Sequence, residues 1–94
     1  MRWVWDPAKD RLNRRKHGIG FETARRVFED PLALSRQDTF AGEERWQTIG
    51  LIGPVIVLVI HTLPSGEANE EVGRIVSARK ATPRERRAYE GGSF

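Results

Sequence analysis

The chain has 94 residues, enough for one compact domain, which excludes a multidomain enzyme built around a large cofactor-binding fold. It contains no cysteine, so disulfides and thiolate metal sites are excluded, and we expect a protein of the reducing cytoplasm. The longest apolar run, residues 55–60, is far shorter than a membrane span, and no apolar segment follows a basic N-terminus. We therefore expect a single domain over residues 1–94 with no membrane partner.

The net charge of +3 is unevenly distributed along the chain. Residues 1–26 carry +5, residues 27–71 carry −6 and residues 72–94 carry +4. If the fold brings the two ends together, the protein has a basic face that attracts phosphate groups. Ordinary solvated surface charge explains the same numbers, so charge alone does not establish nucleic-acid binding.

The N-terminal part predicts a short strand followed by a helix. Residues 2–5 are aromatic and brief, as in an edge strand. Asp6 is a suitable N-cap, Pro7 a suitable first helical residue and Gly18 a suitable C-terminal cap, so a helix is expected over residues 7–17. Its apolar content is thin, mainly Ala8 and Leu12.

A second helix is expected over residues 21–28, because Phe21, Ala24, Val27 and Phe28 recur at helical spacing. Asp30-Pro31 ends it. The two helices then form an N-terminal hairpin.

The rest of the chain predicts strands and a final helix. Alternation or apolar content favours strands over residues 32–36, 45–52, 55–60 and 71–79. The unbroken apolar run of residues 55–60 is typical of a central strand buried on both faces. Thr82-Pro83-Arg84-Glu85 is a capping box, so a helix is expected to run to Glu90. The predicted fold class is α+β, a small antiparallel sheet with an N-terminal helix hairpin and a C-terminal helix.

Most catalytic motifs are missing from the sequence. There is no glycine-rich phosphate loop, no histidine pair at metal-ligand spacing and no serine in a strained glycine elbow. We therefore expect neither a metal nor a cofactor. The remaining candidates are cationic residues in or near predicted strands, namely Arg45, His61, Arg74 and Arg79.

Arginine and histidine together suit phosphodiester chemistry. The planar guanidinium matches phosphate oxygens and stays charged, while histidine moves a proton near neutral pH. RNA supplies its own nucleophile, the 2′-hydroxyl, so such cleavage requires no metal. Arg74 and Arg79 are five residues apart and should face opposite sides of a strand unless a bulge intervenes. Two plainer interpretations remain open: Arg74 as a paired charge on the sheet, and His61 as a hydrogen-bonded residue ending a core strand.

Several segments along almost the whole chain resemble one family in order and spacing. They are Trp5-Asp6-Pro7-Ala8-Lys9, Asn13, Lys16-His17-Gly18, Phe21-Glu22, Ala24-Arg25, Val27-Phe28, Asp30-Pro31-Leu32, Gly42-Glu43-Glu44-Arg45, Ile49-Gly50, residues 74–82, Arg84-Glu85-Arg86 and Tyr89. Together they resemble the BrnT-type toxins of bacterial type II toxin-antitoxin systems. One departure is Gly20, where the family usually has serine or another good N-cap before Phe21.

The resemblance implies a RelE-like ribonuclease fold, RNA cleavage and inhibition of translation. It also implies a BrnA-like ribbon-helix-helix antitoxin as partner, a hetero-oligomer of the two proteins, and promoter DNA bound through the complex. Arg45, Arg74 and Arg79 fall on basic positions that recur in the family, and Lys9 and His17 fall on its first-helix motif.

Our leading hypothesis is a metal-independent endoribonuclease toxin of the cytoplasm. The expected catalytic residues are Arg45, His61, Arg74 and Arg79, and the expected RNA-binding residues are Lys9, Arg14, His17 and Lys80. In this hypothesis the arginines stabilise the scissile phosphate and His61 assists proton transfer. The alternatives are a non-catalytic nucleic-acid-binding subunit of a repressor complex and a pure protein-interaction subunit.

Overall fold

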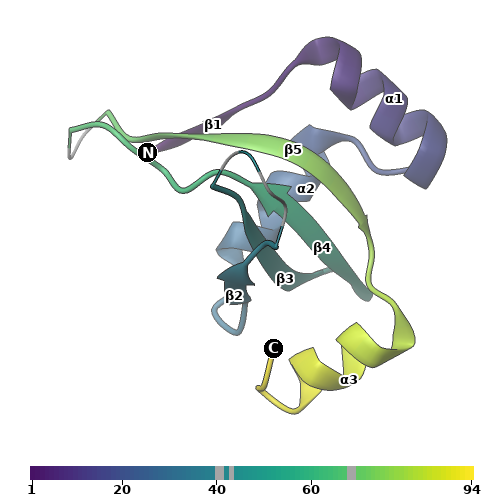
Figure 1. Cartoon of the computed structure of the whole chain (residues 1–94). Helices are drawn as coiled ribbons and strands as arrows, with labels where there is room; N and C mark the ends of the chain where they lie inside the picture. The colour runs from purple at the N-terminus through teal and green to yellow at the C-terminus, as the bar shows by residue number, and fades with distance from the viewer. Residues whose placement is uncertain (40–41, 43, 68–69) are drawn as a thin grey trace.

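The computed structural model describes residues 1–39, 42, 44–67 and 70–94, in which a five-stranded sheet packs against helices (Figure 1). The elements in chain order are β1 (Arg2–Val4), α1 (Pro7–His17), α2 (Phe21–Ala24), the 3-10 helix η1 (Arg25–Glu29), β2 (Leu34–Gln37), β3 (Trp46–Ile52), β4 (Val55–His61), β5 (Val72–Lys80) and α3 (Pro83–Glu90). The predicted α+β class is confirmed. Glu43 of the motif before β3 lies outside the described residues.

The strand order across the sheet is β1-β5-β4-β3-β2. The edge position of β1 and the central position of β4 are therefore as predicted. All neighbouring strands among the described residues are antiparallel except β1, which runs parallel to β5. The small, mostly antiparallel sheet is thus as predicted, and the parallel pairing of β1 is an additional feature of the structure. β1 and β5 lie far apart in the chain, so no short hairpin forces them to be antiparallel.

The two faces of the sheet are covered differently. We call the face that packs against α2 and η1 the N-terminal face, and the face that packs against α3 the C-terminal face. Phe21, Val57, Val59, Ile75 and Ala78 belong to the core of the N-terminal face. A smaller core on the C-terminal face contains Ile49, Leu58 and Ala81, with Tyr89 and Phe94 packed against it.

Strand β4 contributes to both cores, because three consecutive residues, Val57, Leu58 and Val59, are buried. Side chains alternate along a strand, so burial of consecutive residues means that both faces are covered. This confirms the prediction from its unbroken apolar sequence.

The caps predicted for α1 are present, but the helix is held to the sheet by Asn13 and not by its apolar residue Leu12. Asp6 accepts a hydrogen bond from the Ala8 amide at 2.8 Å, and Gly18 ends the helix with φ of 73°. Leu12 is 60% exposed, whereas Asn13 is buried. The Asn13 amide donates to the carbonyls of Ile19 at 2.9 Å and Ala78 at 2.8 Å, and its oxygen accepts from the Ala78 amide at 3.1 Å.

Asn13 thus replaces a strand partner. β1 pairs only with Val72, Gly73 and Arg74, so at Ala78 the outer edge of β5 has no strand partner among the residues that the structure describes. Because unpaired buried backbone groups are costly, the side-chain amide satisfies both groups of Ala78 and fixes α1 beside that edge.

The second helix is shorter than predicted. Only residues 21–24 are α-helical, and the chain continues as the 3-10 helix η1. Phe21, Ala24 and Val27 are fully buried at strict three-residue spacing. That spacing matches the three residues per turn of a 3-10 helix, so the tighter winding keeps Val27 on the sheet. Gly50 of β3 permits the close approach, since a Cβ there would lie 3.0 Å from the Val27 carbonyl oxygen.

The glycine that departs from the family pattern has a structural explanation. Gly20 is the N-cap of α2 and provides no side-chain hydrogen bond. Asp10 of α1 accepts from the Phe21 amide at 2.8 Å instead, and a Cβ on Gly20 would lie 3.0 Å from Cδ of Arg14. The preceding helix therefore supplies the cap that a serine would have provided.

The C-terminal helix forms as predicted. Thr82 accepts from the Glu85 amide at 3.2 Å, and Glu85 accepts from the Thr82 amide at 2.9 Å. This reciprocal pair is the capping box expected from the sequence. The longest helix, α1, has 11 residues, and no membrane-spanning helix occurs in the described part of the chain.

Candidate functional site

A β-bulge determines where the C-terminal arginines lie. Ile60 pairs with Ser77, but the next β4 residue, His61, pairs with Ile75, so β5 contains one extra residue, Val76. Ile75 and Ala78 consequently share the N-terminal face although they are three positions apart, an offset that would put them on opposite faces of a regular strand. Alternation from these two positions puts Arg74, Ser77 and Arg79 on the C-terminal face.

Arg45 lies at the same end of this face as Arg74. It immediately precedes β3, and its carbonyl accepts from the Asp38 amide at 2.8 Å, which extends the β2–β3 ladder by one pair. Trp46 pairs with His61 on the N-terminal face, so alternation puts Arg45 on the C-terminal face. Thr62 lies between them, since its amide donates to the Arg74 carbonyl at 2.9 Å.

The three arginines do not form one compact cluster. β3 and β5 flank β4, which separates the backbones of Arg45 and Arg74 by about 10 Å. Arg79 is five residues further along β5, roughly 15 Å of strand. The C-terminal face therefore carries cations spread over a length greater than a single phosphate group.

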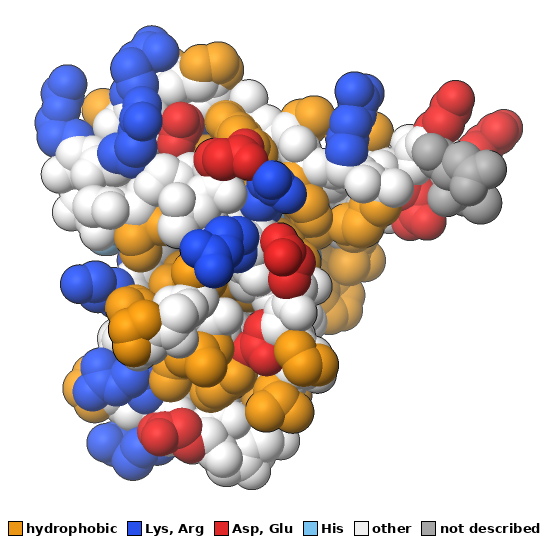
Figure 2. Space-filling view, turned by 180° about the vertical axis from the view of Figure 1, so that it is seen from behind, with side chains coloured by type: hydrophobic (Ala, Val, Ile, Leu, Met, Phe, Trp, Pro, Cys, Tyr) orange, Lys and Arg blue, Asp and Glu red, His pale blue; other side chains and the backbone are white. Residues whose placement is uncertain are grey.

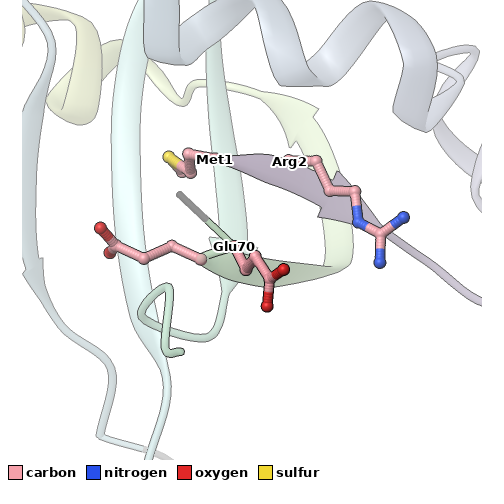
Figure 3. A pocket seen from close by; sticks show the side chains of 4 residues that line it. Met1, Arg2 and Glu70 are labelled. Carbon is pink, nitrogen blue, oxygen red and sulfur yellow. The ribbon is translucent and has the colours of Figure 1, made fainter. Parts of the chain in front are cut away.

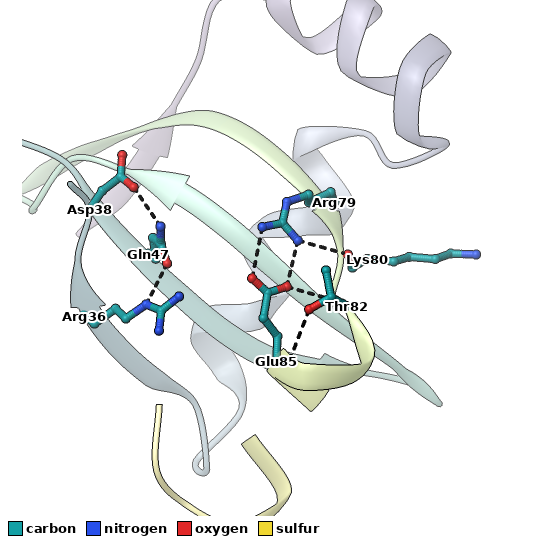
Figure 4. A network of polar contacts seen from close by, with 7 residues as sticks. All are labelled: Arg36, Asp38, Gln47, Arg79, Lys80, Thr82 and Glu85. Carbon is teal, nitrogen blue, oxygen red and sulfur yellow. Dashed lines mark hydrogen bonds and ion pairs between the residues drawn. The ribbon is translucent and has the colours of Figure 1, made fainter. Parts of the chain in front are cut away.

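Arg79 is held by the C-terminal helix. Its Nη1 donates to Oε1 of Glu85 at 2.7 Å and its Nη2 donates to Oε2 at 3.0 Å (Figure 4). A further Nη1 contact reaches the Lys80 carbonyl at 3.4 Å. Hydrogen bonding to Arg79, opposed by partial burial, lowers the pKa of Glu85 to about 2, so the pair is ionised at neutral pH. Hydrogen bonding to Glu85 correspondingly raises the pKa of Arg79.

A second polar group lies across the same face, on β2 and β3. Arg36 donates to Gln47 at 2.8 Å, and Gln47 donates to Asp38 at 2.7 Å. Figure 4 shows this group and the Arg79 group on one side of the sheet, with β4 between them. The guanidinium of Arg36 also lies 4.0 Å from the ring centre of Phe94, so the C-terminal residue borders this face.

An open groove of about 720 Å³ connects Arg79 with the basic residues of α1. It runs between α1 and the outer edge of β5. Its lining consists of Lys9, Leu12, Asn13, Arg15, Lys16, His17, Val76, Ser77 and Arg79. Figure 2, seen from behind, shows Lys and Arg side chains at the α1 end, in the middle and at the α3 end of the molecule, with Asp and Glu side chains interspersed among them and others gathered at the tip where β5 begins.

The four predicted RNA-binding residues are not all in this groove. Lys9 and His17 line it. Arg14 lies on another side of α1, where its guanidinium is 3.8 Å from Asp10. Lys80 borders a separate hollow beside Arg86, near the turn that joins β3 to β4.

His61 lies away from the arginines. It belongs to the N-terminal face, is only 3% exposed, and its ring makes edge-on contacts with Trp3 and Phe28. Nδ1 is 2.7 Å from the Thr62 carbonyl and Nε2 is 2.6 Å from the Thr48 hydroxyl. A carbonyl only accepts, so Nδ1 carries the proton and Nε2 accepts from Thr48. Burial, partly offset by the bond to Thr62, lowers the pKa of His61 and favours the neutral ring.

This arrangement matches the plainer interpretation of His61 as a hydrogen-bonded residue ending a core strand. Both ring nitrogens are occupied by protein groups, so in this conformation the ring is not available to a molecule bound on the C-terminal face. Any direct role in proton transfer would require the ring to leave Thr48 and Thr62.

Another pocket, of about 620 Å³, lies at the opposite end of β5 from Arg79 (Figure 3). It is lined by Met1, Arg2, Glu70 and Glu71. Carboxylates repel phosphate, so this pocket is not part of the cationic face. Among the described residues no group of three or more His, Asp or Glu side chains could hold a metal ion.

Sequence reasoning missed two residues that organise the site. Asn13 fixes α1 beside β5, and Glu85 holds Arg79. Both lie in segments already singled out, the first-helix motif and the capping box. However, the contact of Asn13 with Ala78 spans 65 residues, and nothing in a capping box indicates that its glutamate also binds a strand arginine.

The fold and site define a small α+β protein with arginines spread over one sheet face and a basic groove leading to them, which suits a nucleic-acid backbone. The chain belongs to the BrnT family: a family model described as a ribonuclease toxin, BrnT, of type II toxin-antitoxin systems matches residues 5–85. No curated protein gives a match. The protein is thus a ribonuclease toxin of a type II system, a family that implies an RNA substrate and an antitoxin partner.

Proposed function

We propose that this protein is a metal-independent endoribonuclease that cuts RNA by attack of the 2′-hydroxyl and thereby inhibits translation. The observation that carries the proposal is the bulge at Val76, which brings Arg74 and Arg79 to one face. The family match over residues 5–85 supports a single toxin domain over residues 1–94.

The arginines bind different phosphates along the RNA backbone. Arg79, at the junction of the groove and the C-terminal face, binds the scissile phosphate. Arg45 and Arg74, at the far end of the face, bind the neighbouring backbone. Lys9 and His17 guide the RNA along the groove, while Arg14 and Lys80, outside it, add to the field that attracts RNA.

The cleavage step needs charge stabilisation more than any other contribution. The 2′-oxygen loses its proton and bonds to phosphorus, the bond to the 5′-oxygen breaks, and that oxygen gains a proton. The products are a 2′,3′-cyclic phosphate and a 5′-hydroxyl. Negative charge on the phosphate oxygens rises in the transition state, and a fixed guanidinium stabilises it without reorganisation. Because RNA brings the nucleophile, a metal is unnecessary for this route.

Proton transfer by His61 would require the ring to leave its partners, because it is buried and both nitrogens are hydrogen-bonded. We therefore base the proposal on the arginines.

The partner we propose is a BrnA-like ribbon-helix-helix antitoxin that neutralises the toxin in a hetero-oligomer and binds promoter DNA through that complex. The basic residues of the groove favour a partner segment that carries acidic groups. We further propose that the protein acts in the cytoplasm, where RNA and ribosomes are present.

The test is cleavage of free RNA in EDTA, together with a separate measurement of protein synthesis in a translation extract that keeps its magnesium. Arg79→Ala should reduce cleavage by about 100- to 1,000-fold, the usual effect of removing one charge-stabilising donor. The matched control is Arg26→Ala, which removes the same charge from an exposed residue of η1 outside the groove. The products should end in 2′,3′-cyclic phosphate.

Two outcomes would contradict the proposal. Equal cleavage by the wild type and Arg79→Ala would remove Arg79 from the site, and loss of wild-type cleavage in EDTA would indicate a metal. RNA binding without cleavage, with affinity that falls steeply as salt rises, would support the non-catalytic alternative instead.

A further inference from the structure

Arg79 presents two hydrogen-bonding edges, and only one of them is used by the protein. The guanidinium is planar and has five N–H donors. The edge formed by Nη1 and Nη2 holds both carboxylate oxygens of Glu85, at 2.7 and 3.0 Å. The remaining Nη1 proton points toward the Lys80 carbonyl at 3.4 Å.

The other edge consists of Nε–H and the second proton on Nη2. Within the part of the chain that the structure describes, neither donates a hydrogen bond to the protein. Two parallel donors on one edge are the arrangement by which arginine binds phosphate in bidentate fashion. The side chain of Arg79 is 37% exposed, so solvent and ligands can reach it.

Glu85 is itself held on two sides. Its Oε1 also accepts from the Thr82 amide at 2.9 Å, and the capping box fixes its backbone at the start of α3. The Glu85 side chain is only 14% exposed and the pKa of its carboxyl group is about 2, so the carboxylate stays charged in the folded protein near neutral pH. A charged group fixed in this way limits the orientations open to the guanidinium.

We propose that Glu85 is a positioning residue for RNA cleavage. It binds the Nη1–Nη2 edge of Arg79 and so directs the Nε–Nη2 edge toward the scissile phosphate. This inference rests on the proposed function of Arg79. It assigns the C-terminal helix a part in the reaction, through a residue that does not touch RNA.

The proposal predicts opposite effects on rate and on affinity. The negative charge of Glu85 repels RNA, so its removal should leave RNA binding unchanged or make it tighter. The same removal frees Arg79 to adopt other orientations, which should slow the chemical step. A purely structural role would not separate the two quantities in this way.

The experiment measures the cleavage rate at saturating RNA and the dissociation constant of RNA for Glu85→Gln. Glutamine retains the capping hydrogen bond but removes the charge. The rate should fall by about 10- to 100-fold, as expected for a misplaced catalytic group, while the dissociation constant should stay equal or decrease. The matched control is Thr82→Ala, which weakens the same cap and should retain the wild-type rate in the folded protein.

The double variant Arg79→Ala with Glu85→Gln completes the test. If Glu85 acts only through Arg79, the double variant should cleave at the rate of Arg79→Ala alone. A wild-type rate in Glu85→Gln, or an equal further loss in the Arg79→Ala background, would overturn the positioning role. Wild-type cleavage by Arg79→Ala would instead overturn the proposed function, so the two failures are distinguishable.

Discussion

The two faces of the sheet use polar residues in different ways. His61 on the N-terminal face and Asn13 at the adjoining outer edge of β5 are buried, and their hydrogen bonds are made to other protein groups. On the C-terminal face α3 covers only part of the sheet, and Arg74, Ser77 and Arg79 are partly exposed. A histidine and an arginine near each other in the sheet can thus differ completely in availability.

This difference predicts two kinds of variant. Changes on the N-terminal face should lower the free energy of unfolding and leave the chemistry of the folded protein unaltered. Changes at the arginines of the C-terminal face should instead mainly slow cleavage, because these side chains are partly exposed and ion pairs near the surface contribute little to stability.

The largest effect on stability is expected for Asn13→Ala. The substitution leaves both backbone groups of Ala78 and the Ile19 carbonyl without their side-chain partner in a buried region. Unsatisfied buried groups cost about 1 to 3 kcal/mol each, and partial access of water reduces the sum, so we expect a loss of about 3 kcal/mol. Urea unfolding followed by circular dichroism would measure it.

The control for this change is Leu12→Ala, the neighbouring residue on α1. Leu12 is exposed, and its truncation should change the free energy of unfolding by less than about 0.5 kcal/mol. If the two variants were equally stable, α1 would not be held by Asn13.

A smaller effect, with a distinctive pH dependence, is expected for His61→Gln. Glutamine replaces the ring that contacts Trp3 and Phe28, and we expect a loss of about 2 kcal/mol at pH 8. Burial lowers the pKa of His61 in the folded state, so below the ordinary value of 6.5 the unfolded state binds more protons. Wild-type stability should therefore decrease as the pH falls through 6.5, and His61→Gln should lack this component.

The same variant decides the role of His61 in cleavage. Unfolding curves at several pH values and cleavage rates of the folded fraction would be measured together. Retained cleavage with reduced stability would agree with the structure, whereas lost cleavage with unchanged stability would restore His61 as a proton-transfer group.

Local signals in the sequence predicted most of the fold. The caps of α1 and α3 and the apolar run of β4 depend on neighbouring residues, so they could be recognised without tertiary information. The parallel pairing of β1 with β5 and the 3-10 winding after Ala24 depend on distant contacts, and both were missed. Gly20 has no side chain to cap α2, and Asp10 of α1 accepts from the Phe21 amide instead, which is also a contact between separate helices.

The candidate site was predicted less completely. The arginines could be selected by residue type, but their common face depends on a single inserted residue in β5, which no sequence pattern marks. Sequence also offered no measure of burial for His61, whose polar ring lies between two aromatic side chains. The residues that support the site were found only through the contacts that they make.

The smallest effect on the free energy of unfolding is expected for Tyr89→Phe, which tests how much the Tyr89–Asp30 hydrogen bond contributes to holding α3 on the C-terminal face. The Tyr89 hydroxyl donates to Oδ2 of Asp30 at 2.5 Å, and that carboxylate also accepts from the amides of Leu32 and Leu51. Although burial opposes the change, these three hydrogen bonds lower the pKa of Asp30. Asp30 retains two partners in the variant, so the loss should be below about 1 kcal/mol at pH 8.

The contribution of Tyr89 should disappear at alkaline pH. The hydrogen bond to Asp30 raises the pKa of Tyr89 to about 12, above its ordinary value of 10.0. A raised pKa means that the folded state holds its proton longer, so this stabilisation is present below pH 10 and is lost between pH 10 and about 12. The difference between wild type and Tyr89→Phe in urea unfolding should therefore shrink over that interval. If wild type and Tyr89→Phe were equally stable at pH 8, Tyr89 would stabilise α3 through its ring alone, and α3 would be held on the C-terminal face by apolar packing rather than by the bond to Asp30.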